Sequence, residues 1–557
     1  MNINDPAGRI EASHTVVDRI MEQSGYCNRI MDACIDLKKK IEQTQDEETL
    51  LKLNNELQLK MNRMLKLKKY ALDIHETFRT IPRSSERLQQ AGEYFYGGKF
   101  EEMDEALDDG EICAEIERLN EDLHSKDEEQ KKKTRVRLEC RSYELIIKAL
   151  YRYTFIENPE WHKDVYDLLE AAHDASCNVH ALFEFAAYLM ITTEKDWAIE
   201  LLDDAYVMAR ELNGENCSLY EAKCLWAKGV IARKKQNFPE AIEHVGKALK
   251  IYTLLTEKNP VEYRPRMADM LTVMGDYHTY SENYATAVVV FEEAVKIRRE
   301  LALHGSGEDA MNLARTLDKL AVVHTCLGEY GDAVSRFEDA LRIENDQLEY
   351  NLYMVLAAKA NILYNLSAAL FGAKKYDGAI RRIKEELEVR KKVRETDPFG
   401  QLPLMARAHD VLADAYLELG QPEDAIRERE EIVKLYKTLA EHSPETWLCS
   451  LGEALNQCSN LYFEMKSYDK YFLLTKKALE VFRKLAAGDP EKYLISVGCL
   501  LGNVCHYYEM ISPDRKKKIE TAREICRILS SVERDELTEI VYAKAKEILG
   551  TYPWRTI

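Results

Sequence analysis

Residue types that could support catalysis are present in this sequence, but their spacing does not assemble a catalytic site. Glu170 and His173 have the Glu-x-x-His spacing of di-iron helical bundles, yet such a centre needs a second copy of the motif and two further glutamates. His409 and Asp410 are adjacent without a nucleophile placed near them by spacing. Gly-rich phosphate loops, Gly-x-Ser-x-Gly and His-Glu-x-x-His do not occur. The sequence therefore predicts a protein that is not an enzyme, with no catalytic residue, no metal site and no cofactor.

Charge and cysteine usage exclude further classes. The formal net charge is −19, which disfavours nucleic acid and anionic membranes as partners, because both are bound by Lys and Arg. The N-terminal residues 1–14 lack the apolar segment of a signal peptide, and no apolar run approaches the roughly 20 residues of a membrane span. None of the 13 cysteines forms a Cys-x-x-Cys pair, so we expect buried thiols in a reducing compartment. These features predict a cytoplasmic protein.

A strict 46-residue period organises the middle of the chain. Its clearest markers are a series of small or aromatic anchors, most of them three residues after an aromatic: Ala241, Ala287, Ala333, Ala379, Ala425 and Tyr471. Each unit reads as two helices, the first with apolar residues at i, i+3, i+4 and i+7, as in Met267, Met270, Leu271 and Met274. Such a pair cannot bury its apolar faces alone. Units in tandem must therefore stack into an α-solenoid.

The junctions between units share a second motif. TEKNPVEY (Thr256–Tyr263), AEHSPETW (Ala440–Trp447) and AAGDPEKY (Ala486–Tyr493) each place a good N-cap residue before a proline and a glutamate. This order favours the start of a helix. Two copies carry a further proline, Pro265 and Pro403. Because proline breaks a helix from within, we expect the long helix to begin at the second proline in those copies.

The repeat resembles the tetratricopeptide repeat. The resemblance rests on a small residue in the first helix, an aromatic before the second helix, and an alanine near the start of that second helix, as in Gly275, Tyr284 and Ala287. The usual period of that family is about 34 residues, so this chain is similar to long-repeat members such as the kinesin light chain type and the arrays of bacterial signalling and defence NTPases. The resemblance covers about 225–529. It implies an all-α, right-handed solenoid that acts by binding, and it carries over no catalytic residue.

The two ends differ from the array. A heptad pattern runs through Leu50, Leu53, Leu57, Lys60, Met64, Leu67, Ala71, Ile74 and Phe78. It predicts an N-terminal helical hairpin that either packs on itself and on the first repeats, or forms a coiled-coil arm for dimerisation or docking. Val532–Leu549 reads as a capping helix. The expected domains are a hairpin at 1–80, degenerate helical repeats at 81–217, the array at 218–529, and a capping helix with a tail at 530–557.

The first helix of each pair lines the concave face in this type of fold, so its in-phase polar residues are the predicted partner-binding residues. They are Asp269, Asp276, Arg315, Asp318, Arg407, Asp410, Asp414, Asn456 and Asn460. Arg315/Asp318 and Arg407/Asp410 repeat two units apart and suit charge-assisted hydrogen bonds to a peptide. The alternative is that each Arg pairs with its own Asp, which is worth under about 1 kcal/mol on a surface.

The function predicted from these features is a non-catalytic scaffold that binds a partner protein or peptide, with homodimerisation through residues 9–80 as an added option. One alternative is a peptide-sensing regulatory protein of a bacterial signalling or defence system. Another is an enzyme with an unrecognised site in 81–217. Strongly perturbed carboxylates or a bound metal in that segment would favour the enzyme.

Overall fold

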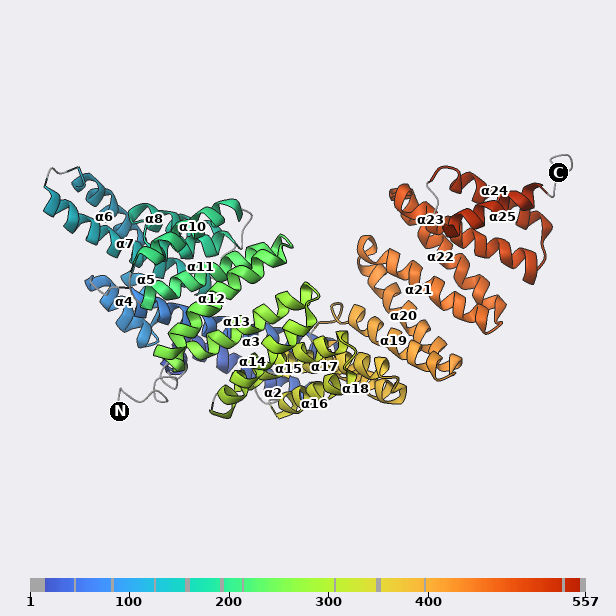
Figure 1. Cartoon of the computed structure of the whole chain (residues 1–557), viewed down its shortest axis with the longest axis horizontal. Coiled ribbons are helices and arrows are strands. Elements are labelled where there is room, and N and C mark those ends of the chain that lie inside the picture. Colours follow the sequence, from blue (N-terminus) through green and yellow to red (C-terminus); the bar gives the residue numbers. More distant parts are fainter. Residues whose placement is uncertain are drawn as a thin grey trace. The chain divides into compact units, whose positions relative to one another are not determined.

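The computed structural model is helical in almost all of its described part, and no strand occurs there. The described residues are 16–44, 47–81, 85–124, 127–155, 161–190, 195–212, 215–304, 307–346, 352–394, 397–532 and 536–550. The chain forms two compact units, Met1–Asn351 and Leu352–Ile557, and each is described by itself (Figure 1).

The first unit contains helices of very different lengths, followed by a regular series. Its helices are α2 (Gly25–Gln43), α3 (Glu47–Thr80), α4 (Glu86–Tyr96), α5 (Phe100–Ala106), α6 (Asp109–Asp122), α7 (Glu128–Phe155), α8 (Trp161–Ala175), α9 (Val179–Leu189), α10 (Lys195–Glu211), α11 (Glu215–Lys234), α12 (Phe238–Lys258), α13 (Pro260–Tyr280), α14 (Tyr284–His304), α15 (Gly307–Cys326) and α16 (Tyr330–Asp346).

The second unit continues the regular series. Its elements are α17 (Leu352–Gly372), α18 (Tyr376–Arg394), α19 (Leu402–Glu418), α20 (Pro422–His442), α21 (Pro444–Glu464), α22 (Tyr468–Gly488), α23 (Pro490–His506), a π-helical turn η1 (Tyr507–Ile511), α24 (Arg515–Leu529) and α25 (Glu536–Gly550). The last helix packs on α23 and α24 and begins four residues after the predicted start of the capping helix.

The 46-residue period is confirmed by the helix boundaries. The second helices of the repeats begin at Phe238, Tyr284, Tyr330, Tyr376, Pro422 and Tyr468, each 46 residues after the last. The five alanine anchors are fully buried, and Tyr471 is 3% exposed. The anchors are therefore the points at which each second helix meets its neighbours.

Two backbone features recur with this period. The turn between the two helices places Gln236, Glu282, Gly328, Lys374, Gly420 and Lys466 at φ between 57° and 77°, a region that favours glycine. The small residue of the first helix is explained by the close packing of the two helices of a repeat. A Cβ on Gly275 would lie 2.7 Å from the ring of Phe291 on the second helix, so this glycine lets the helices approach.

The two additional prolines behave differently from each other. Pro403 lies in the first turn of α19, as predicted. Pro265 lies inside α13, which already begins at Pro260, so the predicted later start is wrong there. The proline forgoes one main-chain hydrogen bond, and the buried side chains on both sides of it, among them Tyr263 and Leu271, keep the helix continuous.

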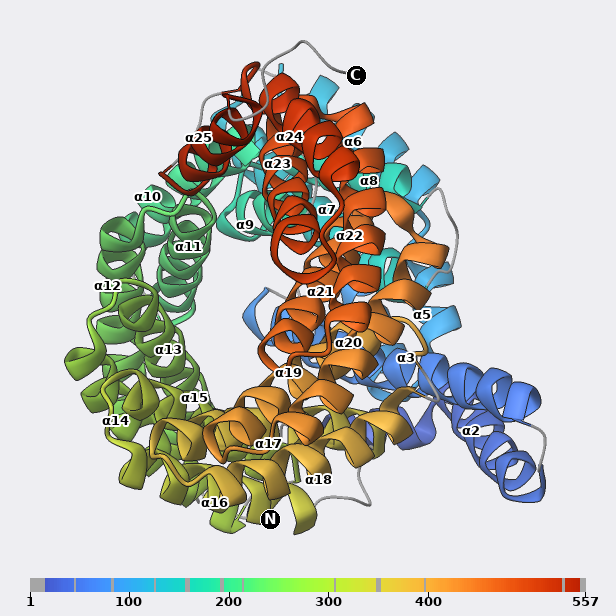
Figure 2. The ribbon, with the colours of Figure 1, turned by 90° about the vertical axis from the view of Figure 1, so that its right-hand side faces the viewer.

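The N-terminal hairpin is joined to the core of the first unit at one end. The C-terminal half of α3 buries Leu67, Ala71, Ile74 and Phe78 in a cluster shared with α4, α7 and α9, and α3 packs on both α2 and α7. Figure 2 shows α2 beside α3 in this hairpin. In the first half of the heptad pattern, Leu53 and Leu57 are half-buried, and the side chain of Leu50 lies outside the described residues. The coiled-coil arm stays a prediction.

The division into units falls between Asn351 and Leu352, inside the segment 218–529 that was expected to form one array. Residue 352 holds the phase position of the junction proline, and there the sequence has Leu352 in place of a capped proline corner. The weakest junction motif therefore coincides with the boundary.

One helix departs from the expectation that no apolar run is long enough to span a membrane. Val355–Gly372, in α17, is long and apolar enough by length and composition, with a mean hydropathy of 1.2 over 18 residues. This helix packs against α18 and buries Leu363 and Leu366. Interior helices of packed repeats have the same composition, so this segment is weak evidence for a membrane span.

Candidate partner-binding site

The predicted polar residues lie on first helices of the repeats, in both units. Asp269 and Asp276 are on α13, Arg315 and Asp318 on α15, the residues Arg407, Asp410 and Asp414 on α19, and Asn456 and Asn460 on α21. The two Arg/Asp pairs of matching phase therefore belong to different units. Each set is considered within its own unit.

In the first unit, the phase position of Asp269 links the two helices of a repeat. Asp269 accepts a hydrogen bond of 2.6 Å from Arg298 on α14, and Arg298 is buried. One repeat later the charges are exchanged, because Arg315 on α15 interacts electrostatically with the buried Glu344 on α16. In both repeats one of the two positions is acidic and the other is basic, and their order is reversed from one repeat to the next.

Glu344 in this unit is a buried carboxyl with a raised pKa. It is 1% exposed, and neither carboxylate oxygen has a hydrogen-bond partner. Burial raises its pKa to about 7, against the favourable charge of Arg315 and together with the like charge of Asp318. The predicted binding residues Arg315 and Asp318 therefore adjoin a buried acid.

Asp276 connects neighbouring repeats. Its carboxylate pairs with Lys319 on α15, and burial raises its pKa, while the lysine opposes that shift. Arg315 donates to Asn312 on its own helix. Of these contacts, the Asp276–Lys319 pair links α13 to α15.

In the second unit, Arg429 on α20 gathers the acids of α19. It pairs with Asp410, donates to Asp414 at 2.6 Å and donates to Gln457 on α21 at 3.1 Å. Burial raises the pKa of Asp414, while Arg429 opposes that shift. This cluster connects three successive helices.

The remaining predicted residues of this unit lie near the cluster. The guanidinium of Arg407 lies 4.6 Å from the ring centre of Tyr364 on α17. The Asn456 side-chain oxygen is buried with no hydrogen-bond partner, whereas Asn460 is exposed. Arg407 and Asp410 therefore each have a partner on another helix, in place of the local Arg–Asp pair considered as an alternative.

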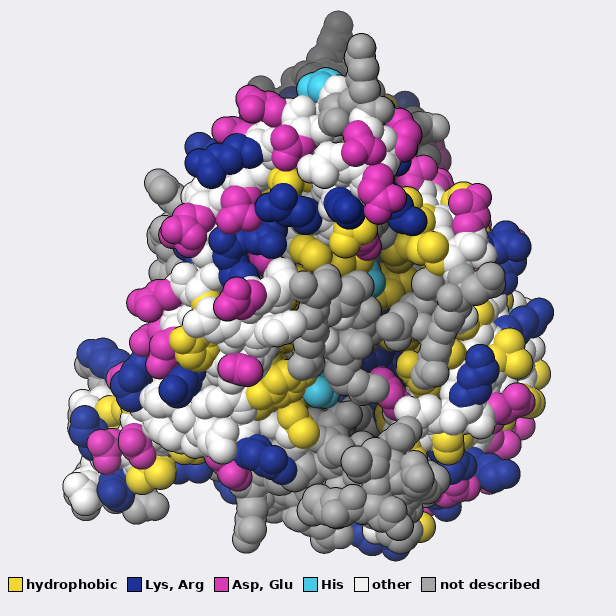
Figure 3. Space-filling model, turned by 90° about the vertical axis from the view of Figure 1, so that its left-hand side faces the viewer, with side chains coloured by type: hydrophobic (Ala, Val, Ile, Leu, Met, Phe, Trp, Pro, Cys, Tyr) yellow, Lys and Arg dark blue, Asp and Glu magenta, His cyan; other side chains and the backbone are white. Residues whose placement is uncertain are grey.

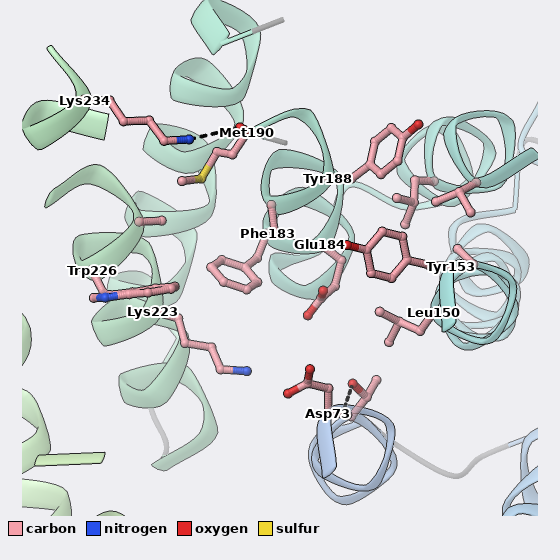
Figure 4. Close-up of a pocket in the computed structure, with 16 residues that line it drawn as sticks. Asp73, Leu150, Tyr153, Phe183, Glu184, Tyr188, Met190, Lys223, Trp226 and Lys234 are labelled. Atoms are coloured by element: carbon pink, nitrogen blue, oxygen red, sulfur yellow. Dashed lines mark hydrogen bonds between the residues drawn. The ribbon is translucent and has the colours of Figure 1, made fainter. Parts of the chain in front are cut away.

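A separate cavity lies in the first unit, between the helices that precede the regular array and α11, the first helix of that array. It has a volume of about 640 Å³ and lies between α3, α7, α8, α9 and α11 (Figure 4). This size lies within the usual range of ligand sites. The side chains that line it are Asp73, Thr77, Ala149, Leu150, Tyr153, Val165, Leu169, Phe183, Glu184, Ala187, Tyr188, Met190, Lys223, Trp226, Ala227 and Lys234.

The middle of the cavity is apolar and aromatic. Leu150 and Tyr153 project from α7, Phe183 from α9 and Trp226 from α11 (Figure 4). Trp226 is 38% exposed, so an indole face remains accessible to solvent. An exposed tryptophan beside buried aromatic rings is typical of an anchor position in recognition sites.

Charged groups from three helices lie at one end of the cavity. Asp73 on α3, Glu184 on α9 and Lys223 on α11 point toward one another (Figure 4). The ammonium of Lys223 lies 4.8 Å from the ring centre of Tyr220 and 5.5 Å from that of Phe183. The end of the cavity thus combines two carboxylates, one ammonium and aromatic faces.

The comparisons with known proteins agree with the repeat geometry. Residues 313–343, which cover most of α15 and most of α16, match the tetratricopeptide repeat family. The chain carries tetratricopeptide repeats. No curated protein sequence is significantly similar to it.

Several solved structures share this helical repeat at low identity. The signal-transduction ATPase with a tetratricopeptide repeat sensor from Pyrococcus horikoshii is 15% identical, with 83% of this chain and 74% of that chain covered and a TM-score of 0.44. Aspartyl phosphate phosphatase F from Bacillus subtilis is 16% identical, with 72% and 95% covered and a TM-score of 0.37. A putative kinesin light chain of Podospora anserina is 15% identical, with 42% and 99% covered and a TM-score of 0.33. At such identities and scores, none of these structures bears on what this chain binds.

Sequence reasoning missed the cavity because the cavity lies outside the tetratricopeptide phase. It joins the hairpin (Asp73), the segment 81–217 and the first helix of the array (Lys223, Trp226). The available signal was α9, whose residues are almost all buried apolar or aromatic groups. A short helix that is apolar on every side must be surrounded by other helices.

The groups considered for catalysis have ordinary structural contacts. Glu170 accepts a 3.2 Å hydrogen bond from Tyr166 on its own helix, and His409 lies 2.6 Å from Glu428. Among the described residues, His324, Glu329 and Asp332 could together approach a metal ion, and His324 already contacts Glu329 at 2.7 Å. That contact lies at the turn between α15 and α16.

The cysteines whose side chains the structure describes, which leaves out Cys217, are reduced thiols. Burial raises the pKa of Cys224 to about 12, which keeps this thiol protonated and unreactive at neutral pH.

Proposed function

We propose that this chain is a non-catalytic scaffold that binds a partner protein or peptide. The observation that carries the proposal is the cavity of the first unit, with its apolar middle, its partly exposed Trp226 and its charged end. Cavities with an apolar wall and a few convergent polar groups bind ligands and fix their orientation. Helical repeats supply a rigid support for such a site.

The polar groups of the cavity favour recognition over chemistry. The Tyr188 hydroxyl donates a 2.6 Å hydrogen bond to the main-chain oxygen of His162, and Lys234 donates to the main-chain oxygen of Met190 at 3.5 Å. Thr77 donates to the main-chain oxygen of Asp73 at 2.9 Å. The Tyr188 and Lys234 bonds join α9 to α8 and α11, and the Thr77 bond lies within α3, so these groups support the wall of the cavity and leave its shape and charge for a partner.

The polar residues on the first helices form a further contact surface in each unit in this proposal. Asp269 in the first unit and Asp410 and Asp414 in the second pair with arginines, yet about half of each side chain stays exposed. A basic partner segment could share these carboxylates. The other predicted residues of the surface are Asp276, Arg315 and Asp318 in the first unit and Arg407, Asn456 and Asn460 in the second.

Pairing of two copies through residues 9–80 and a cytoplasmic location are further parts of the proposal. Met31 and Ile35 on α2 and Leu59 on α3 are exposed apolar residues of the hairpin, which supports pairing. Elsewhere, one face of the molecule shows acidic and basic side chains intermixed (Figure 3), as expected of a surface in water.

Site-specific photo-crosslinking of the full chain tests the proposal. Trp226→p-benzoylphenylalanine is compared with Leu303→p-benzoylphenylalanine, since Leu303 is an exposed apolar residue on α14. Both variants are irradiated in a lysate of the organism that encodes the chain. We expect a protein or peptide adduct at residue 226 that residue 303 does not give. The same adducts at both positions, or none at 226, would contradict a recognition site in the cavity.

A further inference from the structure

We infer that the cavity of the first unit takes a peptide segment that presents an aromatic or branched aliphatic side chain next to a lysine or arginine. The inference rests on the proposed function and names the chemistry of the occupant. It comes from two parts of the cavity, the apolar middle and the charged end, which lie side by side (Figure 4).

The apolar middle selects the first side chain. Leu150, Phe183 and Trp226 come from three different helices and face one space. A large apolar side chain placed there removes both its own surface and that of the partly exposed Trp226 from water. The free energy gained grows with the apolar area buried, so aromatic and branched aliphatic residues are favoured over small ones.

The charged end selects the second side chain. Asp73 and Glu184 contribute two negative charges and Lys223 one positive charge, so the group as a whole carries one negative charge. A cation from the ligand balances that charge, whereas an anion adds to it. The net charge of −19 on the whole chain also attracts basic segments over longer distances.

Lys223 shows how this end accommodates a cation. Its ammonium lies over the rings of Tyr220 and Phe183 and faces the two carboxylates. Aromatic faces and carboxylates together stabilise an ammonium or guanidinium. A ligand lysine or arginine would use the same kinds of partner and would compete in part with Lys223.

Because Lys223 competes with the ligand cation, its removal should increase affinity, and a misfolded variant would not show such an increase. Removing the internal cation with Lys223→Met leaves the two carboxylates without it, so a basic peptide should bind at least threefold more tightly. The double variant Asp73→Asn with Glu184→Gln should weaken the same peptide about tenfold. Trp226→Ala should weaken it tenfold or more. Glu293→Gln, at an exposed position of α14, lies outside both the cavity and the polar residues of the first helices and serves as the matched control, with unchanged affinity.

The probe is a displayed library of random 12-residue peptides selected on the full-length chain, followed by fluorescence anisotropy of the enriched peptides. We expect enrichment of peptides with a large apolar residue beside Lys or Arg. Replacing that Lys or Arg with Gln should abolish the effects of the Lys223 and Asp73/Glu184 variants. Circular dichroism of each variant checks the fold.

Three results would overturn the inference. They are enrichment of acidic peptides, no enrichment at all, and enriched peptides that bind wild type and Trp226→Ala equally well. The last result would place binding elsewhere on the scaffold, so the proposed function would stand while the assignment of the occupant fails. Failure of the proposed site is read independently, because the absence of a crosslinked adduct at residue 226 would contradict a recognition site in the cavity whichever peptides the library enriches.

Discussion

The regular array and the irregular helices before it use the same kind of building block in different ways. In the array, second helices begin every 46 residues, and two glycines of first helices meet side chains of second helices, Gly229 meeting Val245 and Gly275 meeting Phe291. Before the array, helix length varies from 7 residues in α5 to 34 in α3. Helices of unequal length leave space that regular repeats fill, and the cavity lies where these irregular helices meet α11.

The two regions also differ in what their polar residues contact. In the array, Asp269, Asp410 and Asp414 bind arginines on neighbouring helices. In the cavity, Asp73 and Glu184 face the same space as Trp226. Regular packing therefore uses polar groups to hold helices together, whereas in our proposal the polar groups of the cavity face a partner.

The largest expected effect separates packing from recognition. Phe291→Ala removes a ring that is 1% exposed and should lower the free energy of unfolding of the first unit by about 3–5 kcal/mol. Trp226→Ala should cost less than half as much, because the indole is 38% exposed. Urea denaturation followed by circular dichroism measures both. Equal losses would mean that Trp226 serves the core and would weaken the contrast between the two regions.

The buried acid of the array should make the stability of the first unit depend on pH. The carboxyl of Glu344 has a pKa of about 7 in the folded chain against 4.5 as its ordinary value. Its raised pKa favours folding below pH 4.5, and that contribution is lost as pH rises through 7. The loss should reach about 3 kcal/mol.

Glu344→Gln should remove this pH dependence. Urea midpoints of wild type and variant between pH 4.5 and 8 provide the measurement. If both chains change alike with pH across that range, Glu344 does not titrate as proposed. Glu386→Gln is the matched variant in the second unit, where burial likewise raises the pKa of Glu386 to about 7.

Close packing in the array predicts opposite effects for two glycines of the first unit. Gly275→Ala places a methyl group 2.7 Å from the ring of Phe291 and should cost about 1–3 kcal/mol. Gly246→Ala, on α12, meets no atom within 4 Å and should stabilise its helix by about 0.5–1 kcal/mol. Thermal denaturation compares them. A stabilising Gly275→Ala would refute the close approach of α13 and α14.

The smallest expected effect concerns the turn within each repeat. Glu282 adopts φ of 59°, and Gly328 occupies the next equivalent position at 77°. Glu282→Gly should stabilise the first unit by up to about 1 kcal/mol, since glycine tolerates this conformation. Gly328→Ala should destabilise it by about the same amount. If both variants changed the melting temperature in the same direction, backbone conformation would not decide stability at this turn.

Much of the array could be predicted from the sequence because it repeats. The anchors from Ala241 to Tyr471 are buried, since a position that packs in one repeat packs in the next. The predicted helix start at Pro265 is wrong, because the buried residues around it outweigh the tendency of proline to interrupt a helix. The division after Asn351 was also missed. A boundary depends on contacts between repeats, which a period does not record.

The cavity could not be predicted for a related reason. Its residues come from Asp73 to Lys234 and from five helices that share no period. Their meeting is decided by tertiary packing of helices with unequal lengths. The predicted residues of the first helices did fall on those helices, but the sequence did not show that Asp269 and Asp410 bind arginines of neighbouring helices.

Hydrogen–deuterium exchange of the full-length chain, with and without a basic peptide selected on it, tests the central claim most directly. The account predicts that the peptide protects amides of α9 and α11, which carry Phe183, Glu184, Lys223 and Trp226, and that Trp226→Ala abolishes this protection. Protection of α19 and α21 with no change in α9 and α11 would contradict it, and would place recognition on the regular array.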